Sequence, residues 1–197
     1  MTLDSTGQMS RASSERGLTS GGLLHRFDEC VALHPEKGAI LFKNQEVSYR
    51  ELKERSLRVA TKLKHHGVSL ESFVPFCFPK SVHAIVAILA ILRCGAAFAA
   101  ILPSAPLQRK REIIEACGSN VLVCGVDEKI PTEGLCKNQI VLGDDVIGDI
   151  AELGEDNETP GVFPIPTNSN AACVLFTSGS TGSKFPPSQF RHCILSH

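Results

Sequence analysis

Short apolar runs alternate with amphipathic segments from residue 24 to residue 176. The apolar runs predict buried strands at residues 73–78, 96–102, 121–124, 139–142 and 171–176. The segments around them predict helices at residues 24–34, 49–66, 82–94 and 106–116, and a small hairpin around residues 43–45. Strand and helix in alternation indicate an α/β fold with a mostly parallel sheet flanked by helices. Ligands of such sheets bind beyond the carboxyl ends of the strands.

Local signals mark where several of these helices begin and end. Ser48 followed by Glu51 is typical of a capping box, with Ser48 as the N-cap. Gly67 is placed as the residue that ends this helix, and Gly95 and Gly118 are expected to end the next two. On the helix after Ser48, apolar residues share one face: Tyr49, Leu52, Val59, Ala60 and Leu63.

One domain over residues 23–184 accounts for this pattern, and three segments depart from it. Residues 1–22 are rich in Ser, Thr and Gly and are expected to form a disordered tail. Residues 143–170 carry acidic residues and prolines but no Lys or Arg, which predicts a solvated connector within the domain. Residues 185–197 form a divergent C-terminal tail.

Composition argues against several classes of partner. A net charge of -1, one tyrosine and no tryptophan give neither a basic patch nor a stacking platform for nucleic acid. The eight cysteines are scattered without a CxxC pair. We therefore expect neither a metal site nor a disulfide framework, but buried free thiols in a reducing, cytoplasmic compartment.

Residues 84–102 are long and apolar enough to raise the question of a membrane span. Arg93 lies in their middle, where a charge costs about 2.5–3.5 kcal/mol on insertion scales, and Gly95 breaks the helix soon afterwards. A buried helix followed by a buried strand explains the same residues. The first residues hold no apolar signal segment, so no membrane partner is expected.

A glycine- and hydroxyl-rich stretch follows the last predicted strand. Glycines let the backbone approach a ligand, consecutive free N–H groups can surround an anion, and a lysine adds positive charge. The candidate binding residues are Thr177, Ser178, Gly179, Ser180, Thr181, Gly182 and Lys184. The spacing differs from the phosphate loop of the NTPases. The alternative is a Ser/Gly surface loop without chemistry.

The order Phe-Thr-Ser-Gly-Ser-Thr-Gly at residues 176–182 resembles the ATP-phosphate loop of the adenylate-forming superfamily. This superfamily includes adenylation domains of nonribosomal peptide synthetases, acyl-CoA ligases and luciferases. There the loop continues as x-Pro-Lys-Gly, whereas here Ser183 and Lys184 precede Phe185. The resemblance implies that residues 177–182 hold the β- and γ-phosphates of ATP.

Two further motifs occur in the family's order. Residues 47–52, Val-Ser-Tyr-Arg-Glu-Leu, resemble the first core motif of peptide synthetase adenylation domains. Residues 92–98, Leu-Arg-Cys-Gly-Ala-Ala-Phe, resemble the second, which residues 106–109 close with Pro-Leu-Gln-Arg. Ala100 and Leu102 stand where the family has Pro and Asp. The resemblance thus implies a partial N-terminal subdomain of the adenylate-forming fold.

The family reaction implied is ATP-dependent activation of an amino acid or other carboxylic acid as an acyl-adenylate, with Mg²⁺, followed by transfer to a carrier-protein phosphopantetheine. In the family, the residues that select substrate, hold Mg²⁺ and supply the catalytic lysine follow the third motif. We therefore expect a truncated adenylation domain, inactive alone, with no catalytic or metal-binding residue in this chain. The alternatives are an acyl-CoA ligase fragment, or a non-catalytic fragment that binds nucleotide or another chain covering its incomplete sheet.

Overall fold

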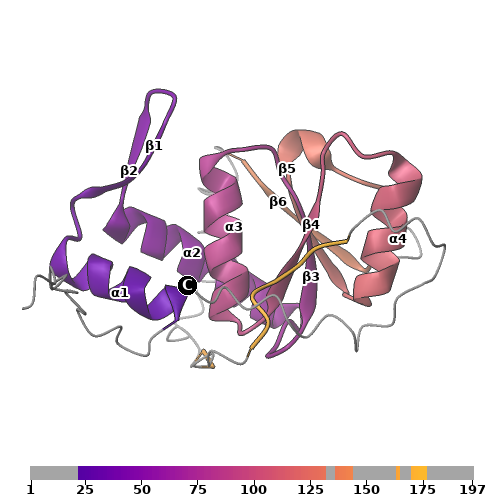
Figure 1. Ribbon diagram of the computed structural model, residues 1–197, viewed down its shortest axis with the longest axis horizontal. Coiled ribbons are helices and arrows are strands. Elements are labelled where there is room, and N and C mark those ends of the chain that lie inside the picture. The colour runs from indigo at the N-terminus through magenta and orange to yellow at the C-terminus, as the bar shows by residue number, and fades with distance from the viewer. Residues whose placement is uncertain (1–21, 132–135, 144–162, 165–169, 177–197) are drawn as a thin grey trace, which may run out of the picture.

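The computed structural model describes residues 22–131, 136–143, 163–164 and 170–176, which form a layered α/β unit (Figure 1). The terminal tails and most of the acidic connector lie outside these ranges. The elements are α1 (Leu23–Leu33), β1 (Gly38–Phe42), β2 (Gln45–Ser48), α2 (Tyr49–His65), β3 (Phe73–Cys77), α3 (Val82–Arg93), β4 (Ala97–Ile101), α4 (Leu107–Cys117), β5 (Val121–Gly125), the 3-10 turn η1 (Val126–Glu128), β6 (Asn138–Leu142) and β7 (Cys173–Val174).

Five strands form one parallel sheet in the order β6-β5-β3-β4-β7, which confirms the predicted α/β class. The central pair β3 and β4 is in continuous register, from Phe73 opposite Ala97 to Cys77 opposite Ile101. On the other side of β4, Val174 of β7 lies opposite Ala99. The predicted hairpin is also confirmed: β1 and β2 pair antiparallel and project from the body of the protein (Figure 1).

Two apolar layers cover opposite faces of the sheet, with α2 and α3 on one side and α4 on the other (Figure 1). Alternate residues of each strand supply the two layers, since side chains of a strand point alternately to its two faces. Phe76 of β3 packs in the layer of α3, whereas its neighbour Cys77 packs in the layer of α4. Most apolar side chains of α3 are buried between α2 and the sheet, as expected of an enclosed helix, whereas Ile85 is exposed.

The predicted helix ends are confirmed, with one difference at the start of α2. The Ser48 hydroxyl accepts a hydrogen bond from the Glu51 backbone N–H at 3.2 Å, so Ser48 is the N-cap. The Glu51 carboxylate accepts from Arg55 instead of reaching back as a capping box requires. Gly67, Gly95 and Gly118 have φ values of 85°, 71° and 59° where the three helices end, a region that favours glycine.

Replacing the N-cap Ser48 by alanine removes the one side-chain acceptor recorded at the start of α2. We expect Ser48→Ala to lower the free energy of unfolding by about 1 kcal/mol, as for other N-cap losses. Urea unfolding followed by circular dichroism measures the change. Ser104→Ala, an exposed serine outside any helix, is the control and should stay within about 0.5 kcal/mol of wild type. Equal effects of the two changes would contradict the capping role.

The strand predicted at residues 171–176 is shorter than expected, because only Cys173 and Val174 pair with β4. β7 is the outermost strand of the described sheet, so it has a partner on one side only. Val174 is buried, whereas the side chain of Leu175 is 58% exposed. Of the six residues at 171–176, only Val174 is fully buried. The strand is therefore shorter than the apolar run predicted.

Arg93, predicted to lie in a buried helix, is itself buried at 8% exposure. Its guanidinium donates to both carboxylate oxygens of Asp28, from Nη1 to Oδ2 at 3.2 Å and from Nη2 to Oδ1 at 2.8 Å. Lys53 approaches the same carboxylate at 3.2 Å. This ion pair joins α1, α2 and α3. No helix within the described ranges is long and apolar enough to cross a bilayer.

Seven of the eight cysteines lie in the described ranges, and none of these seven forms a disulfide. Cys77, Cys94 and Cys124 are fully enclosed. Burial raises the pKa of Cys94, Cys117 and Cys124 to about 12, because the charged thiolate loses its hydration. These thiols therefore act as small apolar side chains of the core rather than as nucleophiles.

Candidate functional site

The parallel sheet brings the ends of β3, β4 and β7 to one edge. Cys77 and Ile101, the last residues of β3 and β4, are register partners. On the other side of β4, Val174 lies opposite Ala99. Phe176 comes two residues after Val174, and Ile101 two residues after Ala99, so extending the same register places Phe176 level with Ile101. Phe176 packs against both apolar clusters that contain the ends of these strands. The chain therefore arrives at the carboxyl edge immediately before the glycine- and hydroxyl-rich stretch.

The connections after β3 and β4 leave the sheet in opposite directions. β3 leads into α3 on one face, and β4 leads into α4 on the other (Figure 1). Neighbouring strands with this arrangement define a topological switch point, where α/β sheets bind ligands in the crevice outside the carboxyl ends. Residues 78–81 follow β3 and residues 102–104 follow β4, so both turns begin at this edge.

The turn after β3 is anchored at both ends. Phe78 is 7% exposed and its ring centroid lies 4.9 Å from that of Phe76. The Ser81 hydroxyl accepts from the Ala84 N–H at 3.2 Å as the N-cap of α3 and donates to the Pro79 carbonyl at 3.3 Å. Between these anchors, Pro79 and Lys80 are exposed. The turn after β3 therefore carries one exposed lysine, Lys80, between two anchored residues.

The predicted binding residues Thr177, Ser178, Gly179, Ser180, Thr181, Gly182 and Lys184 lie outside the described residues, so their contacts stay a prediction. The structure gives the position from which they start, directly beyond Phe176. Among the described residues, no cluster of three or more His, Cys, Asp and Glu side chains is suited to a metal ion.

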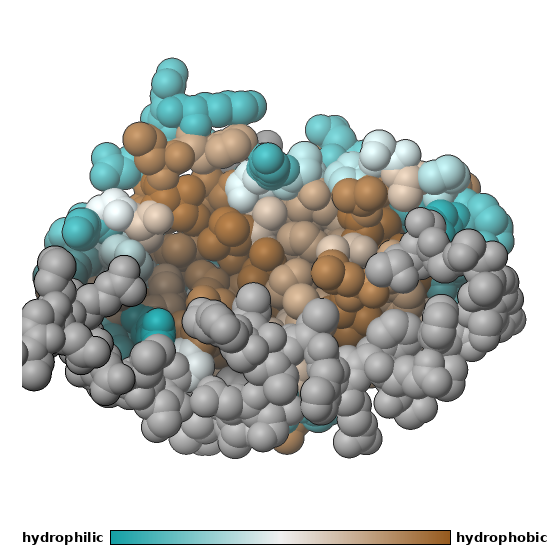
Figure 2. Space-filling view, in the orientation of Figure 1, coloured by the Kyte–Doolittle hydropathy of each residue, from teal (hydrophilic) through white to brown (hydrophobic). Residues whose placement is uncertain are grey.

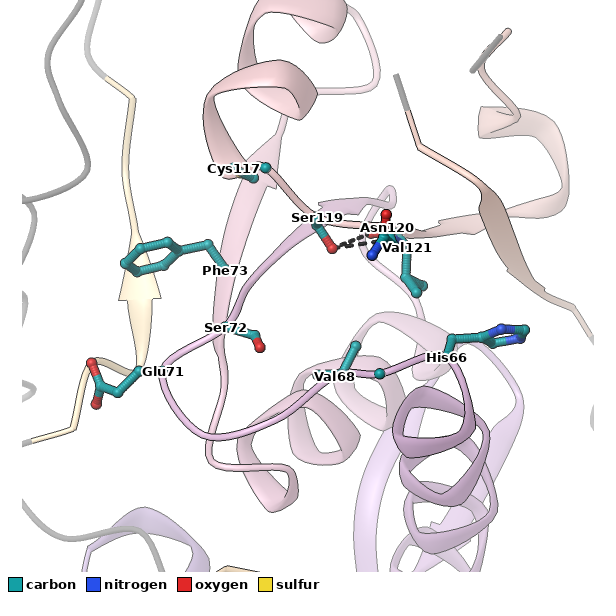
Figure 3. A pocket seen from close by; sticks show the side chains of 11 residues that line it. His66, Val68, Glu71, Ser72, Phe73, Cys117, Ser119, Asn120 and Val121 are labelled. Carbon is teal, nitrogen blue, oxygen red and sulfur yellow. Dashed lines mark hydrogen bonds between the residues drawn. The ribbon is translucent and has the colours of Figure 1, made fainter. Parts of the chain in front are cut away.

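A cavity of about 200 Å³ opens at the opposite, amino edge of the sheet (Figure 3). Its walls include Phe73 at the start of β3 and Val121 at the start of β5, where the Ser119 hydroxyl bonds to the backbone of Val121. Helices α2 and α4 end beside it, at Gly67 and Gly118. Helix carboxyl ends carry partial negative charge, and the binding crevices of parallel sheets lie at the other edge. This cavity is therefore a poor site for a polyphosphate.

Comparison with known families and proteins identifies the fold. The family model described as AMP-binding enzyme matches residues 27–184. The chain therefore belongs to the AMP-binding enzyme family. The N-terminal subdomain of Klebsiella oxytoca NpsA, solved in complex with 3-hydroxybenzoyl-AMSN, aligns with a TM-score of 0.66 at 22% identity. The alignment covers 81% of this chain and 38% of that one, and at this identity it supports the fold alone.

The curated relatives that the chain resembles include nonribosomal peptide synthetases. Nonribosomal peptide synthetase 5 of Gibberella zeae is 35% identical over 156 residues, and the alignment covers 79% of this chain and 1% of that protein. The nonribosomal peptide synthetase-like enzyme fsqF of Aspergillus fumigatus is 37% identical over 161 residues, and the alignment covers 81% of this chain and 11% of that protein. The chain thus spans a small part of the length of these relatives. The predicted resemblance and the partial subdomain are both confirmed.

Two features of this region were not identified from the sequence. The place of Lys80 beside the carboxyl edge was not identified, because it depends on the strand order. The pairing of Asp28 with Arg93 could not be predicted from the sequence, since the two residues are 65 positions apart. A buried arginine in an apolar helix does predict a carboxylate partner, but not which carboxylate.

Proposed function

We propose that the carboxyl edge beyond β4 and β7 binds the triphosphate of ATP through residues 177–182, with Lys184 as a neighbouring cation. The observation that carries the proposal is that β7 lies parallel beside β4, so the glycine- and hydroxyl-rich stretch starts at the edge where such sheets bind ligands. The AMP-binding family match extends through this stretch to residue 184.

The reaction that this site serves is the activation of an amino acid. A carboxylate oxygen attacks the α-phosphorus of ATP, the bond to the β-phosphate oxygen breaks, and an acyl-adenylate and pyrophosphate result. Backbone amides and hydroxyls that hold the β- and γ-phosphates would stabilise the charge on the departing pyrophosphate. Mg²⁺ and a carrier-protein phosphopantetheine complete the scheme. The resemblance to peptide synthetases supports this assignment.

Isothermal titration of the 197-residue chain with ATP tests the site. We expect binding that weakens about tenfold or more in Gly179→Val, because a branched side chain blocks close approach to the backbone amides. Lys184→Met should weaken binding by about fivefold through loss of one charge–phosphate interaction. Lys137→Met, which changes an exposed lysine at the amino edge, should leave binding unchanged. If neither Gly179→Val nor Lys184→Met changes the affinity for ATP, the proposal is wrong.

Catalysis by the isolated chain is a separate measurement. The family resemblance assigns substrate selection, Mg²⁺ binding and the catalytic lysine to segments after the third motif. We therefore expect ATP–pyrophosphate exchange at background level with every amino acid tested. Exchange above background with purified chain would show that these 197 residues suffice for adenylation.

A second candidate is a fragment that binds nucleotide or another chain without catalysis. Large apolar side chains are exposed around the outer strand, with Leu102 at 72% and Leu175 at 58%. Figure 2 shows hydrophobic side chains gathered across the middle of the face seen there. An acyl-CoA ligase-like fragment is a third candidate, supported only in fold by a Mycobacterium tuberculosis fatty acyl CoA synthetase with a TM-score of 0.63 at 15% identity. The absence of disulfides among the described cysteines favours a reducing, cytoplasmic setting for each candidate.

A further inference from the structure

We infer that Glu71, on the turn before β3, is a positioning residue that holds the edge strand β7 in its register on β4. The Glu71 carboxylate accepts a hydrogen bond from Nδ2 of Asn170, which is 99 positions away in the sequence. Asn170 lies three residues before Cys173, the first residue of β7. Both residues belong to the described part of the chain, and the role of Glu71 does not depend on ATP binding.

The sequence of β7 does not specify its own register. Residues 171–176 are all apolar, so no alternation of polar and apolar side chains decides which of them face the core. The pairing itself is short, since only Cys173 and Val174 lie opposite Phe98 and Ala99 of β4. A slip by one residue would move the chain by about 3.3 Å along the sheet and change where it reaches the carboxyl edge. A contact outside the strand is therefore needed to select one register.

The turn that carries Glu71 is fixed relative to β4. The Ser72 N–H donates to the Ser69 carbonyl at 3.1 Å, and the Ser69 N–H donates to the Ser72 hydroxyl at 3.1 Å. The Glu71 N–H donates to the Gly95 carbonyl at 2.9 Å, two residues before β4 begins. Figure 3 shows Glu71 beside the start of β7. The carboxylate is therefore held by the backbone that leads into β4, the strand with which β7 must pair.

The backbone of Glu71 is unfavourable for any residue except glycine. Among the described residues, Glu71 and Lys43 alone combine a side chain with a positive φ, at 63° and 54°. Glu71 occupies the third position of its turn, where a positive φ favours glycine. Glycine would relieve the backbone but would lack the carboxylate. A glutamate at such a position indicates that its side chain has a role of its own, and Asn170 is the partner that its carboxylate contacts.

Two neighbouring amides of β4 report on opposite sides of this strand. The Phe98 N–H donates to the Ala172 carbonyl at 3.2 Å, on the side of β7. The Ala97 N–H donates to the Ser72 carbonyl at 2.9 Å, on the side of the turn that carries Glu71. Either release or a one-residue slip of β7 withdraws the Ala172 carbonyl from Phe98. Amide hydrogen exchange, resolved by NMR, therefore separates a change at β7 from damage to the turn.

Glu71→Gly removes the carboxylate and relieves the positive φ. We expect exchange of the Phe98 amide to become about three- to tenfold faster, and that of Ala97 to stay within about twofold of wild type. The melting temperature should stay close to that of wild type, because relief of the backbone offsets the lost contact. Glu71→Gln keeps an acceptor oxygen and should leave both amides unchanged. Lys43→Gly, the matched control, makes the same backbone change in the β1–β2 hairpin and should also alter neither amide.

Three results would overturn the inference. If Phe98 exchanges at the wild-type rate in Glu71→Gly, the carboxylate does not hold β7. If Ala97 accelerates together with Phe98, the substitution disrupts the turn, and Glu71 has only a structural role there. Asn170→Ala should also accelerate Phe98, and the double variant Glu71→Gly, Asn170→Ala should accelerate it by less than the product of the two single effects. A double variant equal to that product would show that the two residues act independently.

Discussion

Asp28→Asn is expected to lower the free energy of unfolding by about 3 kcal/mol, the lower end of the cost of breaking a buried ion pair. Asparagine keeps the size of the side chain but leaves the guanidinium of Arg93 without its counter-charge. The Arg93 side chain is 9% exposed, whereas the Asp28 side chain is 37% exposed. Partial access of water to the carboxylate keeps the cost at this lower end. Urea unfolding at pH 7 measures the change.

A surface pair provides the control for this prediction. Glu36 pairs with Arg50, and the two side chains are 73% and 58% exposed. Glu36→Gln should therefore cost less than about 0.5 kcal/mol. The double variant Arg93→Met, Asp28→Asn should lose less free energy of unfolding than the sum of the two single changes. In the double variant, neither member of the pair is left as a charge without its partner. Equal costs for Asp28→Asn and Glu36→Gln would show that the buried pair contributes no more than a surface pair.

The same pair makes stability sensitive to acid. Burial alone would raise the pKa of Asp28, but hydrogen bonds and charge from Arg93 and Lys53 outweigh burial and lower the pKa below 3.8. A carboxyl with a lowered folded-state pKa stabilises the fold above its unfolded pKa and loses that contribution as pH falls through the folded value. Wild type should therefore lose part of its stability below about pH 4, and Asp28→Asn should lack this component.

The sequence was informative about the described sheet because each element is encoded by local spacing. The run at residues 121–124 and the face of α2 containing Leu52, Val59 and Leu63 are recognisable without knowing their partners. β7 was less predictable because the extent of an edge strand depends on pairing with β4. The partner of Arg93 could not be predicted, since Asp28 is brought to it only when α1 packs on α2 and α3.

For the candidate site, too, residue types could be interpreted from the sequence but positions in space could not. The chemistry of residues 177–182 is readable from residue type, because glycines and hydroxyls in a short run suit an anion wherever they occur. Their place on the molecule comes from topology, which sets β7 beside β4 and gives the edge to which Phe176 leads. Lys80 shows the limit of sequence reasoning. One lysine in a Pro-Lys-Ser turn has no distinguishing pattern until the switch point between β3 and β4 is known.

The second large effect is a loss of stability in alkaline solution. A thiol is neutral when protonated, so burial favours the protonated form and holds the pKa of Cys94, Cys117 and Cys124 at about 12 in the folded chain, above the ordinary value of 9.0. Their stabilising contribution is complete below pH 9 and is lost as pH rises from 9 toward 12, since unfolding then releases protons. At pH 10 the three thiols together should cost roughly 4 kcal/mol.

Urea unfolding at pH 7 and pH 10, with a phosphine reductant to keep the thiols reduced, measures this loss. The variant Cys94→Ala, Cys117→Ala, Cys124→Ala is the control, because it removes these three thiols and keeps all other titrating groups. We expect the variant to be less stable than wild type at pH 7, through the small cavities it creates, but to lose much less between the two pH values. If both proteins lose the same amount, other groups cause the alkaline transition and the buried thiols make no measurable contribution to it.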